Sequence, residues 1–213
     1  MKKFNKYLEV GADALGLALS SQQVQLLAGH ARELMLWNKK MNLTAITDIR
    51  LVAYKHFVDA LGASTFLEQP ARLMDIGSGA GFPAVPMKIM YPDLDVTMVD
   101  SVRKKVSFLN HVVRTLKLDN IRAVHARVED LARDPGHAHL YDAVTARGFA
   151  DLSKLAKLAR PMLGSWGTIY ALKGESATEE ITPELENQFL ITQKSYSLPV
   201  VNAQRAVIIL KTR

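Results

Sequence analysis

Hydrophobic residues recur at helical spacing through the first third of the chain. One apolar stripe runs from Ser20 to about Trp37. A second stripe follows a helix cap at Thr47 or Asp48 and runs to about Leu61, where the next residue, a glycine, ends it. The two stripes predict amphipathic helices that each turn one face towards a core.

From Arg72 onward, short apolar runs of strand length alternate with segments of helical spacing. This alternation is typical of βαβ units and predicts a parallel sheet in an α/β fold, closed by an antiparallel pair. A short helix is expected over residues 179–186, interrupted early by Pro183. The expected strands are 73–76, 96–99, 121–125, 141–146, 167–172, 189–197 and 205–211.

The chain has 213 residues, a length that suits one domain with an accessory piece. We expect a helical cap over residues 1–66 and one compact α/β domain over residues 67–213. Cysteine is absent, which excludes disulfides, cysteine zinc sites and thiol nucleophiles and fits a reducing cytosol. No apolar run approaches a signal peptide or a membrane span, so we expect no membrane association.

The charge balance is basic, with a formal net charge of +6. This excess suggests an anionic partner such as RNA, although a basic protein without a nucleic-acid role would show it too. Lys39 and Lys40 follow Trp37 where the first helix breaks, and there they suit an RNA-facing turn or a solvated loop.

The most specific signal is a glycine-rich stretch after an apolar run that ends in Asp75. Gly77, Gly79 and Gly81 alternate with small residues, and a helix is expected to begin near Phe82. Glycine permits positive φ and close approach of a ligand, and a helix N-terminus attracts anionic groups. The spacing differs from the dinucleotide fingerprint and resembles the first motif of S-adenosylmethionine-dependent methyltransferases. A structural turn would explain an isolated triplet equally well.

The second landmark is Asp100, which ends the next expected strand 19 residues after Gly81. A carboxylate at about this distance accepts hydrogen bonds from ribose hydroxyls in βαβ nucleotide sites. Asp100 would also serve as a cap for the following helix. Together the two landmarks predict a nucleoside cofactor site.

Ligands of an open parallel sheet bind beyond the carboxyl ends of its strands. Arg147 stands at such an end, where it could pair with Glu129 or Asp142, approach a cofactor through its backbone, or reach an RNA phosphate or guanine edge. His56 lies inside the second expected helix, and we interpret it as a hydrogen-bonded structural residue. The residues expected at this rim are Gly77, Gly79, Gly81, Asp100, Val128, Glu129, Arg147 and Lys173.

The absence of certain residues from the sequence limits which atoms could accept the methyl group. Methylation at pyrimidine C5 needs a cysteine, and the chain has none. Methyltransferases that act on exocyclic amines typically carry a Pro-Pro loop after the fourth strand, and this chain has no Pro-Pro anywhere. Guanine N7 needs neither device, because its lone pair is free at neutral pH. No general base is therefore assigned, and proximity is the expected source of catalysis.

The chain resembles the ribosomal RNA small-subunit methyltransferase G family, also called the glucose-inhibited division protein B family. The Asn-Leu-Thr turn and the Leu-Lys-Gly after the fifth strand are the most particular matches. Ala84 and Gly148 depart from the residues usual in the family, and both replace one small residue by another. The matching blocks are residues 37–46, 55–59, 75–83, 127–129, 146–147 and 171–174.

The resemblance implies a Rossmann-like class I methyltransferase with a seven-stranded, mostly parallel sheet under an N-terminal helical cap. It implies methyl transfer from S-adenosylmethionine to N7 of a guanine in bacterial 16S rRNA near the decoding region, by a cytoplasmic monomer. It places the cofactor on Gly77, Phe82, Val128, Glu129 and Arg147. Contacts of Arg127, Lys173, Lys39 and Lys40 with the rRNA or the small ribosomal subunit are hypotheses.

Three other functions remain open at this point. The first is a small-molecule methyltransferase with the same cofactor loop, which the basic charge disfavours. The second is an NAD-dependent oxidoreductase, which the glycine spacing opposes. The third is an RNA-binding module that has kept the fold without catalysis.

Overall fold

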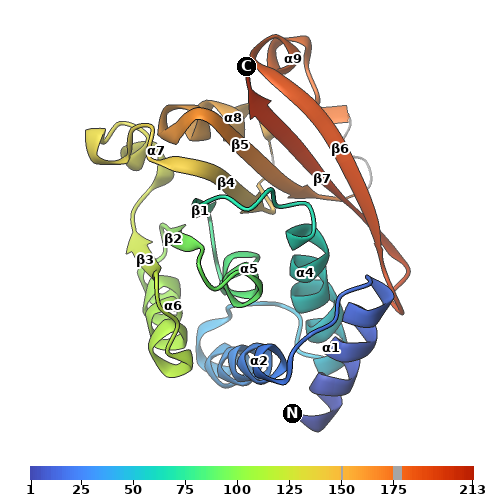
Figure 1. The fold of residues 1–213 in the computed structure, drawn as a ribbon. Helices are drawn as coiled ribbons and strands as arrows, with labels where there is room; N and C mark the ends of the chain where they lie inside the picture. Colours follow the sequence, from blue (N-terminus) through green and yellow to red (C-terminus); the bar gives the residue numbers. More distant parts are fainter. Residues whose placement is uncertain (150, 175–178) are drawn as a thin grey trace.

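A seven-stranded sheet forms the centre of the protein, described here by a computed structural model that covers residues 1–149, 151–174 and 179–213 (Figure 1). The strand order is β3-β2-β1-β4-β5-β7-β6, and only the pairs that involve β7 are antiparallel. This arrangement confirms the expected parallel sheet with its closing antiparallel pair. The strands are β1 (Arg72–Ile76), β2 (Asp95–Asp100), β3 (Ile121–His125), β4 (Tyr141–Arg147), β5 (Leu163–Lys173), β6 (Phe189–Leu198) and β7 (Ala203–Thr212).

Helices cover both faces of the sheet, as crossovers between parallel strands require. On one face α5 (Ala84–Met90) and α6 (Arg103–Leu116) contribute buried residues to one apolar core. On the other face α7 (Val128–Leu131), α8 (Leu152–Ala159) and α9 (Pro183–Gln188) enclose a second core. Two short 3-10 helices, η2 (Pro135–His137) and η3 (Arg160–Met162), complete this side.

The N-terminal helices lie on the same face as α5 and α6 (Figure 1). They are α1 (Lys2–Ala14), α2 (Ser21–Met41), α3 (Ile49–Val52), the π-helix η1 (Ala53–Val58) and α4 (Asp59–Ser64). Their apolar residues share one core with the sheet, so the helices predicted as a cap pack as part of the domain. The boundary after residue 66 therefore stays a prediction.

Helix α2 begins where the pattern predicted and ends later. Ser20 caps it with a capping box, in which its hydroxyl accepts from the Gln23 N–H and the Gln23 side chain accepts from the Ser20 N–H. The helix continues past Trp37 to Met41 because Asn42, in the left-handed conformation, is the residue that terminates it. Hydrophobic spacing alone misses such an end, since Lys39 and Lys40 carry no apolar signal.

The second predicted helix exists but is longer and less regular than expected. Asp48 caps it, accepting from the Leu51 N–H at 2.9 Å, and the helical run continues through η1 to Ser64. Gly62 does not end it. A Cβ at Gly62 would lie 2.5 Å from the Tyr196 ring, so this glycine makes room for β6.

Two further expectations need correction. Pro183 begins α9 instead of interrupting a helix, because the first helical position needs no N–H donor and Thr182 caps the turn. Strand β5 begins at Leu163, earlier than its apolar run suggests, because Ser165 and Trp166 extend it as exposed residues. Among the described residues no helix is long and apolar enough to span a membrane.

Candidate active site

The three glycines form a tight loop between β1 and α5. Gly77, Gly79 and Gly81 have φ values of 71°, 58° and 85°, which residues with a Cβ rarely adopt. The N–H groups of Gly77 and Ser78 donate to the Val99 carbonyl at 2.8 and 3.0 Å. The loop is thereby tied to the end of β2, beside Asp100.

Asp100 connects the glycine loop with the start of α6 at this end of the sheet. Its Oδ2 accepts from the Gly79 N–H and its Oδ1 from the Val102 N–H, both at 2.9 Å, while Lys105 Nζ lies 3.7 Å from Oδ2. A carboxylate has about four lone-pair positions, so acceptor capacity remains for ribose hydroxyls. The bond to Val102 also gives Asp100 the local role before α6 that the sequence left open.

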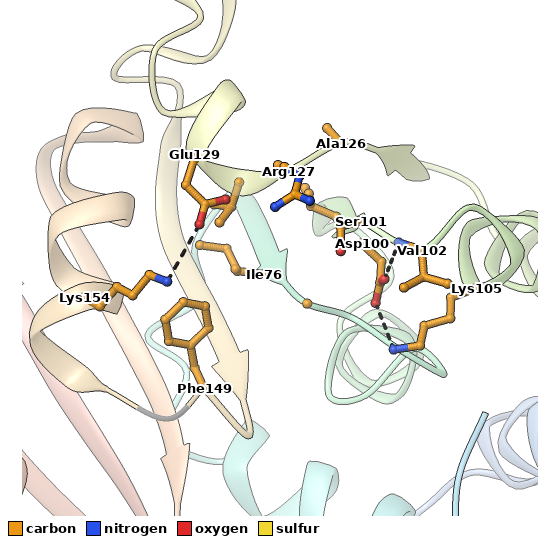
Figure 2. A pocket seen from close by; sticks show the side chains of 13 residues that line it. Ile76, Asp100, Ser101, Val102, Lys105, Ala126, Arg127, Glu129, Phe149 and Lys154 are labelled. Carbon is orange, nitrogen blue, oxygen red and sulfur yellow. Dashed lines mark hydrogen bonds and ion pairs between the residues drawn. The ribbon is translucent and has the colours of Figure 1, made fainter. Parts of the chain in front are cut away.

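A cavity of about 350 Å³ opens beyond the carboxyl ends of β1, β2 and β3, and we call it the first cavity. Figure 2 shows Glu129, Lys154 and Phe149 on one side of it and Asp100 with Lys105 on the other. Glu129 Oε1 lies 3.8 Å from Lys154 Nζ. The cavity is lined by Ile76, Gly77, Val99, Asp100, Ser101, Val102, Lys105, Ala126, Arg127, Val128, Glu129, Phe149 and Lys154.

The lining of the first cavity fits an adenosyl group. Ile76, Val128 and Phe149 offer apolar surface to a flat base. Asp100 faces the same space with acceptor capacity for ribose. Gly77 leaves the rim open, because nothing lies within 4 Å of the position that a Cβ would take.

Four of the eight predicted cofactor residues line this cavity, namely Gly77, Asp100, Val128 and Glu129. Arg127, predicted to contact RNA, lines it as well. Their contacts with a bound cofactor stay predictions. The structure places the remaining four elsewhere: Gly79, Gly81, Phe82 and Arg147.

Gly79 and Gly81 act on the loop itself. Gly79 donates its N–H to Asp100. Gly81 is closely packed, and a Cβ there would lie 2.8 Å from Val85 Cγ2 and 3.2 Å from Leu109 Cδ2. Both glycines therefore hold the loop in its conformation and do not line the first cavity.

Phe82 is buried in an aromatic cluster beneath the loop. The imidazoles of His30 and His56 stack on its ring at centroid distances of 4.8 and 4.9 Å. His30 Nε2 donates to the Ala80 carbonyl at 2.8 Å, which ties α2 to the glycine loop. Burial lowers the pKa of His30 to about 4, so this imidazole is neutral at pH 7. Any cofactor contact of Phe82 must come from its backbone.

His56 has the hydrogen-bonded structural role that the sequence suggested. Its Nδ1 lies 3.4 Å from Arg147 Nη2, and because arginine only donates, Nδ1 accepts. The Nε2–H then donates to Thr44 Oγ1 at 2.8 Å. Burial and the Arg147 charge lower the pKa of His56 to about 3.

Asp75 lies fully buried just before the loop. Burial raises its pKa to about 7, while the charge of Arg147 acts in the opposite direction. The Ser78 hydroxyl donates to the main-chain carbonyl of Asp75 at 3.0 Å, and among the described residues the carboxylate oxygens have no hydrogen-bond partner.

Arg147 lines a second cavity, of about 340 Å³, beyond the ends of β4 and β5. Its guanidinium pairs with Asp59 at 3.5 Å and lies 5.0 Å from the Phe82 ring centroid. Arg147 forms no ion pair with Glu129 or Asp142, the partners considered for it, because Glu129 lies near Lys154 and Asp142 accepts from backbone N–H groups at the start of β1. The second cavity is lined by Ile46, Lys55, His56, Asp59, Arg147, Gly148, Leu172, Lys173, Gly174 and Arg205.

Sequence reasoning missed Asp59 and Arg205 as residues of this rim. Asp59 is buried, and its carboxylate also pairs with Arg205 Nε at 3.2 Å. The sequence offered two signals for Asp59, its charge within an apolar helical stripe and its position in the matching block 55–59. Arg205 comes from the antiparallel β7, which no rule for parallel sheets places at this rim.

The lysines predicted to contact RNA have different surroundings. Lys39 and Lys40 are exposed at the end of α2. Lys173 Nζ is mostly buried and donates to the Phe149 carbonyl and to both Glu180 oxygens, at 2.6 to 2.8 Å. The RNA contacts of all three stay predictions, and the Lys173 ammonium already has protein partners.

Named relatives are similar in sequence over most of the chain. The sequence profile of the family described as rRNA small subunit methyltransferase G matches residues 23–208. Ribosomal RNA small subunit methyltransferase G of Bacillus licheniformis is 39% identical over 208 residues, covering 94% of this chain and 87% of that protein. The protein of that name from Geobacter sp. (strain M21) is 45% identical over 174 residues, covering 82% and 79%.

Solved structures share the fold at low sequence identity. A predicted O-methyltransferase, Atu636 from Agrobacterium tumefaciens, has a TM-score of 0.56 and 19% identity and covers 72% of this chain and 80% of its own. A SAM dependent methyltransferase from Aquifex aeolicus has a TM-score of 0.56 and 13% identity, covering 76% and 93%.

The strand order, the glycine loop and the acid that ends β2 define a class I S-adenosylmethionine-dependent methyltransferase. Within that class, the chain belongs to the rRNA small subunit methyltransferase G family.

Proposed function

We propose that this protein transfers the methyl group of S-adenosylmethionine to N7 of a guanine in bacterial 16S rRNA, near the decoding region. Membership of the rRNA small subunit methyltransferase G family is the observation that carries this proposal. The first cavity supports it, because Asp100, Glu129 and an apolar wall stand where an adenosyl group would bind.

The proposed reaction requires the protein mainly to align guanine N7 with the methyl donor. When bound, S-adenosylmethionine supplies a methyl group that its sulfonium has already activated. The guanine N7 lone pair forms the new bond while the S–CH₃ bond breaks, and no proton has to leave N7. Asp100 and Glu129 hold the donor side, while the rim beyond β4 and β5 admits the base. The rate gain then comes from proximity and orientation.

The partner in this proposal is 16S rRNA, either naked or within the small ribosomal subunit. The formal net charge of +6 supports a polyanionic substrate. We further propose that the enzyme acts in the cytoplasm as a monomer, with residues 1–66 as a cap on the methyltransferase domain of residues 67–213. Sedimentation at micromolar concentration tests the monomer.

Transfer of labelled methyl groups to small ribosomal subunits that lack this modification tests the proposal. The product is mapped by strand cleavage specific for N7-methylguanine. One cleavage site in 16S rRNA is the expected result. Tight S-adenosylmethionine binding without label on RNA would overturn the substrate and point to a metabolite acceptor or a binding module. Preference for NAD in a binding titration would overturn the cofactor.

A further inference from the structure

We propose that Arg205, at the wall of the second cavity, binds a phosphate beside the target guanine and that Asp59 positions Arg205 for this contact. The inference rests on the proposed function and adds to it the residues that hold the substrate phosphate. The contacts at this end of the sheet carry it.

The second cavity adjoins the methyl-donor side. Arg147 and Gly148 line the second cavity, and the next residue, Phe149, lines the first. Adjacent residues after β4 thus line the proposed donor site and the second cavity. Enzymes that modify a base commonly turn it out of its stack into such a pocket, and about 340 Å³ lies within the usual range for ligand sites.

The chemistry of the walls suits a nucleotide. Ile46 and Leu172 offer apolar contact surface, and Gly148 and Gly174 leave the backbone accessible. A flat base requires such surfaces, whereas its phosphate requires a cation nearby.

The cavity has an excess of positive charge. Lys55, Arg147 and Arg205 line it, and Asp59 is its one acidic lining residue. Lys173 adds no net charge, because Glu180 neutralises it. Two positive charges therefore remain uncompensated among the described lining residues.

Arg205 is a cation that a ligand can reach in this cavity. Its Nε pairs with Asp59 Oδ1 at 3.2 Å and its Nη1 donates to the Gln204 carbonyl at 3.0 Å. Nη2 makes no protein hydrogen bond among the described residues, and the side chain is 26% exposed. A guanidinium fixed at one edge and open at the other is well shaped for phosphate oxygens.

Arg147 has a different role, because the protein holds both of its terminal nitrogens. Nη1 donates to the Lys55 carbonyl at 3.3 Å and lies 3.5 Å from Asp59, and Nη2 donates to His56. Arg147 supplies positive potential at the cavity wall, whereas Arg205 supplies the contact.

Asp59 connects the two arginines to the rest of the fold. It is 5% exposed, and its Oδ1 accepts from the Tyr196 hydroxyl at 2.9 Å as well as from Arg205. Burial raises the pKa of Asp59, and the charges of Arg147 and Arg205 oppose that rise. Asp59 touches no substrate in this arrangement and acts by fixing Arg205.

The test compares Arg205→Ala with Arg122→Ala. Arg122 is a matched control, because it lies on β3 outside both cavities and its guanidinium pairs with Asp95 of β2 at 3.6 Å. For Arg205→Ala we expect an approximately tenfold higher KM for the small ribosomal subunit, with kcat and S-adenosylmethionine affinity little changed. The slope of log K for subunit binding against log salt should fall by about 0.7 to 0.9, the value of one lost phosphate contact.

Asp59→Asn and Tyr196→Phe test the positioning role. Both should raise the same KM while Arg205 keeps its charge, so the salt slope should fall less than in Arg205→Ala. An unchanged salt slope in a folded Arg205→Ala, or equal effects of Arg205→Ala and Arg122→Ala, would overturn the inference. Subunit binding is measured without catalysis, so a wild-type protein that binds but methylates nothing would overturn the proposed function alone.

Discussion

At the scale of single residues, the three loop glycines have different structural roles, although they occupy equivalent positions in the sequence motif. Gly77 keeps the rim of the first cavity open, Gly79 donates to Asp100, and Gly81 packs against Val85. The sequence pattern identifies the loop but cannot assign these roles, since each depends on a neighbour distant in the chain or on the opposite side of the loop.

Gly81→Ala should destabilise the fold more than Gly16→Ala. Gly16 also has a positive φ, of 73°, but nothing lies within 4 Å of its Cβ position, so its substitution costs only backbone strain, about 1 kcal/mol. At Gly81 the contact with Val85 adds overpacking, about 1–3 kcal/mol more. Urea unfolding of both variants measures the difference, and equal losses would contradict the packing role.

Asp100→Asn should weaken S-adenosylmethionine binding at least tenfold, because a charged acceptor for ribose is lost, worth about 1.5–3 kcal/mol. Asp142→Asn is the control. Asp142 likewise accepts from two backbone N–H groups, of Ala71 and Arg72, but at the opposite end of the sheet. Isothermal titration of both variants checks this, and similar affinities would remove Asp100 from the cofactor site.

At the scale of elements, one ion pair joins three segments around the first cavity. Lys173 at the end of β5 donates to Glu180 and to the Phe149 carbonyl, and Glu180 Oε2 accepts from the Leu152 N–H that begins α8. Because Phe149 lines the first cavity, this ion pair connects the stability of the rim with the shape of that cavity.

Glu180→Gln should lower the free energy of unfolding by about 2 kcal/mol, because it leaves a mostly buried ammonium poorly paired. It should also weaken S-adenosylmethionine binding through Phe149. The control is Glu68→Gln, which breaks the exposed Lys211–Glu68 pair and should change stability by less than about 1 kcal/mol. If Lys173 instead contacts RNA, only subunit binding should change.

The elements that were predictable from sequence are those with a local signal. The strands, the glycine loop and the Asp48 cap all follow from periodicity or from residues a few positions apart. The π-helix η1 has no local signal, and the pairing of Arg147 with Asp59 joins two elements far apart in the sequence. For the same reason, half of the predicted cofactor residues line the first cavity, while Gly79, Gly81 and Phe82 lie in or beneath the glycine loop and Arg147 lines the second cavity.

At the scale of the whole molecule, two neutral histidines join the N-terminal helices to the site. His30 bonds the glycine loop, and His56 links Arg147 with Thr44. Both have a lowered pKa in the folded state, so the unfolded chain binds their protons more readily. Their contribution to stability is complete above pH 6.5 and is lost as the pH falls from 6.5 towards 4 for His30 and towards 3 for His56. Asp75 acts in the opposite sense, because its pKa is raised.

We therefore expect His30→Gln to reduce the pH dependence of stability. Between pH 7.5 and 5.0 the wild-type protein should lose about 2 kcal/mol more than the variant, since one proton is taken up on unfolding over about 1.5 pH units. Denaturant unfolding at both pH values measures this loss. His125→Gln, at an exposed histidine, should follow the wild type, and a parallel pH profile for His30→Gln would contradict the assignment.

The position of β6 and β7 at the end of the sequence has a consequence for the chain during its synthesis. Tyr196 and Arg205 reach Asp59 from strands that leave the ribosome after every other element of the sheet. A nascent chain of residues 1–188 already contains the glycine loop and Asp100 but neither of these partners. The glycine loop and Asp100 are thus synthesised early, whereas Arg205, the residue proposed to bind phosphate, is added with the last strand. Incomplete chains therefore lack the proposed RNA contact.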